Sequence, residues 1–179
     1  MKPLFLCSIL LGTSVVTHAQ APVGSRALSR SGVARQTWPS PQFDFQISAL
    51  QFLLRNVGFS KGKPDGVFGP VTINAVRAFQ RRRGLVVDGK LGAQTWGKLC
   101  PCLQRGDRGD AVRALQTLLN SNTNQDGEPI YGQLSLDGHF GFDTEKALRR
   151  FQRDTGGKAD GVVGAKSWAS LLTPDDYAP

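Results

Sequence analysis

Asp65-Gly66-Val67-Phe68-Gly69 is a short turn motif that recurs 72 residues later as Asp137-Gly138-His139-Phe140-Gly141. In such a turn the Asp side chain accepts hydrogen bonds from nearby backbone N–H groups, and the first Gly adopts a positive φ. The apolar fourth residue points into a core, and the last Gly lets the next helix start close by. The same Asp-Gly-x-apolar-Gly pattern stands at 88–92 and 160–164. The sequence therefore predicts four related turns.

The turns belong to a unit that occurs twice. Phe79-Gln80-Arg81 and Phe151-Gln152-Arg153 share the same offset of 72, whereas Leu50-Gln51 matches Leu115-Gln116 at an offset of 65. The second copy therefore carries a seven-residue insertion, which we place in the polar stretch 121–133. A fixed internal period is the mark of a duplicated structural unit.

Each copy predicts three helices. Apolar residues at helical spacing define the first helix, Pro70 suits the first turn of the second, and Gly84 and Gly156 end the second helix of each copy. A short third helix carries Trp96 or Trp168. We expect both tryptophans in the core, with stacking on a sugar ring as the alternative. The predicted fold class is all-α, with two tandem small three-helix bundles.

This order of helices and turns resembles the peptidoglycan-binding domain found appended to bacterial cell-wall hydrolases. The resemblance is carried by Asp65 to Thr72, Ala75 to Gln80 and Val87 to Gly89 in the first copy, and by Leu103 to Asp107 and Val112 to Gln116 in the second. It covers about Phe45 to Leu172 and implies a compact three-helix fold that holds peptidoglycan. The long loop at 121–133 departs from the family pattern.

The ends of the chain predict export. Residues 1–19 combine Lys2, an apolar run and small residues ending at Ala19, which is typical of a secretory signal peptide. Residues 20–42 form a basic flexible tether, 43–100 and 101–173 the two domains, and 174–179 a tail. We expect a secreted bacterial protein of the periplasm, cell wall or extracellular space. No later stretch is long enough for a membrane span.

The charge balance favours acidic partners. The chain has 22 Lys and Arg against 14 Asp and Glu, a net charge of +8. Arginines four residues apart on each second helix form a basic stripe, for which a solvated surface is the alternative, and the adjacent glutamines either bind ligand or brace the turn. The candidate ligand-binding residues are Arg77, Gln80, Arg81, Arg149, Gln152 and Arg153. The expected partner is peptidoglycan, with anionic wall polymers as a further candidate and no nucleic acid.

Catalytic residues are scarce in the sequence. His139 is the only histidine after the signal peptide, and Glu128 and Glu145 are the only glutamates. Each Asp-Gly loop supplies one carboxylate, too few for a calcium site of the EF-hand type. We therefore expect no enzyme, no metal and no cofactor. For Cys100 and Cys102 three states stay open: a strained internal disulfide, an intermolecular disulfide, or free thiols.

The sequence thus predicts a secreted, non-catalytic peptidoglycan-binding protein with two binding modules. The alternative is a protein-interaction, targeting or inhibitory module that acts with a separately encoded cell-wall hydrolase or protease.

Overall fold

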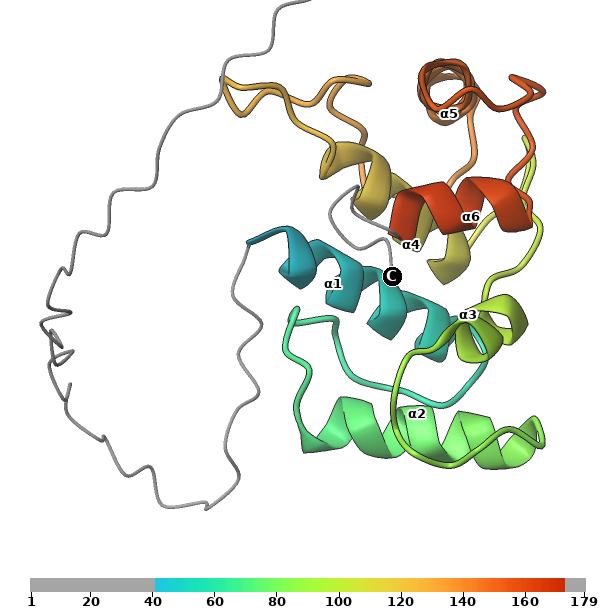
Figure 1. Ribbon diagram of the computed structural model, residues 1–179. Helices are drawn as coiled ribbons and strands as arrows, with labels where there is room; N and C mark the ends of the chain where they lie inside the picture. The colour runs from blue at the N-terminus through green and yellow to red at the C-terminus, as the bar shows by residue number, and fades with distance from the viewer. Residues whose placement is uncertain (1–40, 173–179) are drawn as a thin grey trace, which may run out of the picture. The chain divides into compact units, whose positions relative to one another are not determined.

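The computed structural model describes residues 41–172, and in this range the chain forms six helices and no strand. Three isolated β-bridges join its loops. The first copy supplies the first three helices and the second copy the last three (Figure 1). The all-α expectation is confirmed. The predicted signal peptide, most of the tether and the tail lie outside the described residues. The helices are α1 (Pro41–Asn56), α2 (Pro70–Arg82), α3 (Ala93–Leu99), α4 (Asp110–Asn120), α5 (Phe142–Asp154) and α6 (Ala165–Leu172).

The helix ends follow the sequence signals. α2 begins at Pro70, directly after Gly69 in extended conformation, because proline has the backbone angle of a first helical residue and lacks only an N–H that would be unpaired there. Gly84 follows α2 with φ +67° and Gly156 follows α5 with φ +69°. That left-handed conformation terminates helices and suits glycine. The predicted start of α2 and the predicted ends of α2 and α5 are therefore confirmed.

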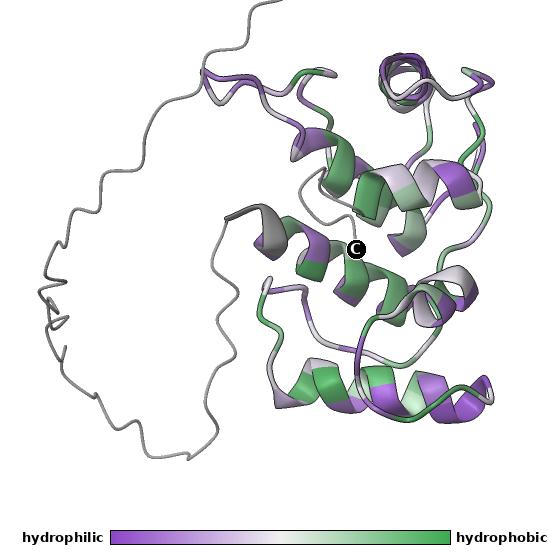
Figure 2. Ribbon diagram, viewed as in Figure 1, coloured by the Kyte–Doolittle hydropathy of each residue, from purple (hydrophilic) through white to green (hydrophobic). Residues whose placement is uncertain are grey.

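The two copies share one hydrophobic core. α1 of the first copy packs along α4 of the second, and this is the most extensive contact between helices in the described chain. Figure 2 shows hydrophobic residues on α1 and α4, and on α2 as well, whereas α5 is largely hydrophilic. Leu50, Leu54, Leu115 and Leu118 are all buried in one continuous cluster. The first helices thus hold the copies together.

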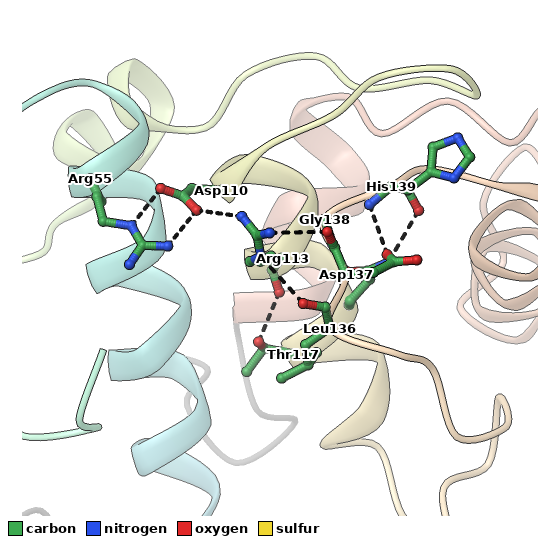
Figure 3. Close-up of polar contacts among 9 residues, drawn as sticks. Arg55, Asp110, Arg113, Thr117, Leu136, Asp137, Gly138 and His139 are labelled. Atoms are coloured by element: carbon green, nitrogen blue, oxygen red, sulfur yellow. Dashed lines mark hydrogen bonds and ion pairs between the residues drawn. The ribbon is translucent and has the colours of Figure 1, made fainter. Parts of the chain in front are cut away.

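A chain of ion pairs crosses the same boundary (Figure 3). Arg55 of α1 donates from Nε and Nη2 to the Asp110 carboxylate of α4, at 2.5 and 2.6 Å. Asp110 also accepts from Arg113 at 2.9 Å, and Arg113 in turn donates to the carbonyl oxygen of Asp137 at 3.0 Å. The network therefore links α1 to the Asp-Gly turn of the other copy. The charged groups of this network are paired and hydrogen-bonded to one another, which makes the geometry of the network specific.

The segment between α3 and α4 is tied to the last helix. The indole Nε1 of Trp168 donates to the carbonyl oxygen of Pro101 at 2.7 Å, and Leu103 pairs with Val163. Of the three states considered for the cysteines, the structure has free thiols. Burial raises the pKa of the Cys100 thiol to about 12, whereas Cys102 is exposed.

Candidate functional site

A buried glutamine holds the turn between α2 and α3. The Gln80 side chain is 1% exposed, and its Nε2 donates to Asp88 Oδ1 and to the Lys90 carbonyl oxygen, each at 2.9 Å. Its Oε1 accepts from the Gly89 N–H at 2.9 Å. Both ends of the amide are therefore occupied by the turn. Of the two roles considered for Gln80, the structure places it as a brace.

The same brace occurs at all four turns. Gln152 contacts Asp160, Gly161 and the Val162 carbonyl oxygen in the same way. Sequence reasoning singled out Gln80 and Gln152 but missed Gln51 and Gln116, which brace the turns at Asp65 and Asp137. The sequence signal for these two braces is the alignment of Leu50-Gln51 in the first copy with Leu115-Gln116 in the second. A Thr or Ser hydroxyl completes each brace, at Thr72, Thr95, Thr144 and Ser167.

The braced carboxylates are stabilised in their charged form. The pKa of Asp65 is lowered, chiefly by the hydrogen bond from Gln51. The pKa values of Asp88, Asp137 and Asp160 are lowered chiefly by backbone N–H groups, at Lys90, His139 and Val162 respectively. These aspartates are turn formers, as expected, and Oδ1 of each accepts from a backbone N–H two residues on.

Arg77 and Arg81 lie on the outward face of α2. With 3.6 residues per turn, they point away from Val76 and Phe79, which are buried in the core. Both arginines are exposed, and neither forms an ion pair within residues 41–172. No acidic residue occurs in α2 at all. The predicted basic stripe thus exists as an uncompensated positive surface, which we call the α2 face.

The outward face of α5 is hollowed. It borders an open cavity of about 510 Å³. Phe142 lies at one end of the helix and is 62% exposed, with the guanidinium of Arg105 5.9 Å from its ring centre. We call this surface the α5 face. Its lining residues are Arg105, Phe142, Glu145, Lys146, Arg149, Arg150 and Arg153.

Arg149 is partly committed to structure within the α5 face. Its Nε and Nη2 donate to Glu145 at 3.0 and 2.9 Å, and its Nη1 donates to the Ala159 carbonyl oxygen at 2.6 Å. Lys146, Arg150 and Arg153 have no ion pair in the described chain, so their charges remain available to a ligand. Predicted residues Arg149 and Arg153 therefore differ in role: one orders the face and the other is free.

The α5 face suits a ligand that is both anionic and partly apolar. Guanidinium groups bind carboxylates with paired hydrogen bonds, and an exposed ring offers an apolar surface. Trp168 is 2% exposed and Trp96 half-buried against the core, so the core expectation is confirmed for Trp168. The exposed ring is instead Phe142, which sequence reasoning missed because the first copy has Pro70 at that position.

The described residues contain neither a metal-binding cluster nor a membrane-spanning helix. No group of three or more His, Cys, Asp or Glu side chains in residues 41–172 is arranged to hold a metal ion. Among the six helices, none has the length and apolar character that crossing a membrane requires.

Comparison with known families identifies both copies. The model of the peptidoglycan binding domain family matches residues 46–99 and 108–171. The chain belongs to this family. The two matched segments contain all four braced turns, the α2 face and, except for Arg105, the α5 face. No solved structure matches the chain.

Several of the curated relatives are cell-wall enzymes by name. An N-acetylmuramoyl-L-alanine amidase of Mycobacterium tuberculosis is 39% identical over 54% of this chain and 25% of its own length. An amidase of the same name from Bacillus licheniformis is 28% identical over 92% of this chain and 52% of its own length. A zinc D-Ala-D-Ala carboxypeptidase of Streptomyces albus G is 34% identical over 63% of this chain and 42% of its own. The chain thus spans about half or less of these relatives.

These names correct one expectation. The scarcity of histidine and glutamate led us to expect that the protein is not an enzyme, and the relatives named as amidases and as a carboxypeptidase contradict that expectation. The expectation rested on the assignment of nearly the whole chain after residue 42 to the two repeats, and these repeats are the part that matches a binding domain.

Proposed function

We propose that the helical unit binds peptidoglycan through the α5 face and the α2 face, and that it serves cell-wall hydrolysis. The observation that carries the proposal is the α5 face itself. It combines three unpaired cations, an ordered arginine and an exposed ring around one hollow, within a segment that matches the peptidoglycan binding domain family.

The chemistry of the ligand fits this surface. Peptidoglycan stem peptides carry carboxylates, which arginine and lysine bind by charge-assisted hydrogen bonds. The sugar and peptide portions offer apolar edges for the Phe142 ring. The Gln80 and Gln152 amides are used by their turns, so we assign ligand contact to Arg77, Arg81 and Arg153, with Arg149 positioning the face through Glu145.

The cellular setting follows from the same proposal. A protein that binds peptidoglycan acts outside the cytoplasmic membrane, and the signal-peptide pattern of residues 1–19 supports export. The names of the relatives support a hydrolase as the activity that this unit serves. A separately encoded wall hydrolase is a partner of the kind this role requires.

Co-sedimentation with purified insoluble peptidoglycan tests the proposal. The variant Lys146→Ala/Arg150→Ala/Arg153→Ala removes three charges from the α5 face, and Lys61→Ala/Lys98→Ala/Lys166→Ala removes three exposed charges elsewhere as the matched control. We expect the first variant to lose at least tenfold in affinity and the control less than twofold. The difference should persist at 0.5 M salt, where the Debye length is roughly 4 to 5 Å. Equal losses in both variants would leave only nonspecific attraction and contradict the proposed site.

A further inference from the structure

We propose that the two outward faces bind two separate peptidoglycan strands, so that one molecule bridges them. This inference rests on the proposed function and goes beyond it. Two binding modules on a flexible linker would both reach one strand, whereas two faces fixed in opposite directions reach different strands.

The order of the helices sets the directions. α2 packs on α1, α1 on α4, and α4 on α5. Figure 1 shows the same order, with α2 and α5 on the two outer sides of the α1–α4 pair. The two helices that carry the basic stripes are therefore the outermost helices at opposite sides of this stack.

The side chains on both outer helices point away from the stack. Val76 of α2 and Leu148 of α5 are fully buried toward the centre. Arg81 and Arg153 lie on the opposite sides of those helices and are exposed. A ligand on the α2 face and a ligand on the α5 face consequently approach from opposite directions.

The arrangement is held rigidly. α1 and α4 share a core in which Leu54 and Leu118 are each 1% exposed. The Arg55–Asp110 ion pair spans the same contact and continues through Arg113 to the turn before α5 (Figure 3). Independent rotation of the copies would break both the apolar contact and the ion pair, so the faces cannot turn to the same side.

The separation of the faces also excludes simple binding to one strand. Packed helices lie 8 to 10 Å apart, and three such spacings separate α2 from α5, so the faces are roughly 25 to 30 Å apart. A single strand would have to wrap around the whole stack to contact both. Two strands need no such bending.

A capture experiment with bead-bound and fluorescent fragments tests bridging. Peptidoglycan fragments are fixed to beads, the purified protein is added and unbound protein is washed away, and fluorescent fragments are then supplied. We expect the wild-type protein to retain fluorescent fragments on the beads. Arg77→Ala/Arg81→Ala and Lys146→Ala/Arg150→Ala/Arg153→Ala are added at concentrations that load the beads as fully as the wild type does, and each should reduce the fluorescence retained per bound protein at least tenfold.

The outcomes separate this inference from the proposed function. Wild-type protein that stays on the beads without capturing fluorescent fragments would overturn bridging while leaving peptidoglycan binding intact. No protein on the beads would instead contradict the proposed function. Undiminished capture by both single-face variants would also overturn the inference, because bridging would then come from self-association. Light scattering of the protein alone at the same concentration identifies that case, and we expect it to show a monomer.

Discussion

A single buried glutamine braces each Asp-Gly turn, and the cost of removing it can be measured. Gln80→Ala leaves the buried Gly89 N–H without its partner and removes one of the two side-chain donors to the Lys90 carbonyl oxygen, the other being the Thr95 hydroxyl at 3.4 Å. Leaving buried polar groups unpaired costs about 1 to 3 kcal/mol, so the free energy of unfolding should fall by about 2 to 3 kcal/mol. Urea unfolding followed by circular dichroism measures it.

Gln94→Ala is the matched control for the brace. Gln94 is exposed at the start of α3, so its loss should change the free energy of unfolding by less than about 0.5 kcal/mol. Equal effects of the two substitutions would show that Gln80 stabilises the protein only as any helical residue does.

The lowered pKa values of the turn aspartates and Asp110 predict acid sensitivity. A carboxyl whose folded pKa is depressed binds its proton more readily in the unfolded chain. The stabilisation is therefore complete above the unfolded pKa of about 3.9 and is lost as the pH falls through the lower folded value. Urea midpoints should be constant from pH 7 to about 5 and fall steadily from about 4.5 to 2.5. Asp110→Asn should reduce the slope, and a flat profile in the wild type would contradict the assignment.

At the scale of the helix and the loop, the polar loop that carries the insertion in the second copy also contains a buried residue. The sequence indicated a loop at 121–133 from its polar residues, and the structure has a loop there. Tyr131 within it is nevertheless only 9% exposed and packs edge-on against Phe151, with ring centres 5.6 Å apart. Tyr131 thus takes the place of Phe59 in the first copy, where Phe59 packs edge-on against Phe79 with ring centres also 5.6 Å apart.

Truncating this aromatic residue should be costly. Tyr131→Ala removes a ring that is only 9% exposed, for which large-to-small changes cost about 3 to 5 kcal/mol. The neighbouring substitution Ile130→Ala removes a side chain that is 41% exposed and should cost less than about 1 kcal/mol. Thermal unfolding of the two variants provides the comparison. A Tyr131→Ala variant as stable as Ile130→Ala would mean that the loop does not dock.

The helices were predictable because each has local signals, whereas their partners were not. Pro70 and Gly84 mark the ends of α2, and the apolar stripe of α1 shows which side is buried. A stripe does not reveal what covers it. That α1 is covered by α4 of the other copy depends on distant contacts such as Arg55 with Asp110. Phe142 was missed for a related reason: an exposed apolar residue does not belong to the periodic stripe of buried residues from which a helix is predicted.

At the scale of the whole molecule, the shared core predicts one cooperative transition. Each copy has its own tryptophan, Trp96 in the first and Trp168 in the second. Two proteins are made in a Trp38→Phe background. Adding Trp168→Phe leaves Trp96 as the reporter of the first copy, and adding Trp96→Phe instead leaves Trp168 as the reporter of the second. Because the α1–α4 core must break when either copy unfolds, each single-tryptophan protein should show the same urea midpoint by fluorescence and by circular dichroism. Separate fluorescence and circular dichroism midpoints within one protein would contradict a single folding unit.

The central claim is that peptidoglycan contacts the outward faces of α2 and α5. Backbone amide NMR of the labelled protein titrated with soluble peptidoglycan fragments tests it most directly. We predict that shifts concentrate at 142–153 on α5 and at 77–81 on α2, and that α1 and α4 between them stay unchanged. Shifts confined to other surfaces, or none at millimolar fragment, would contradict the claim.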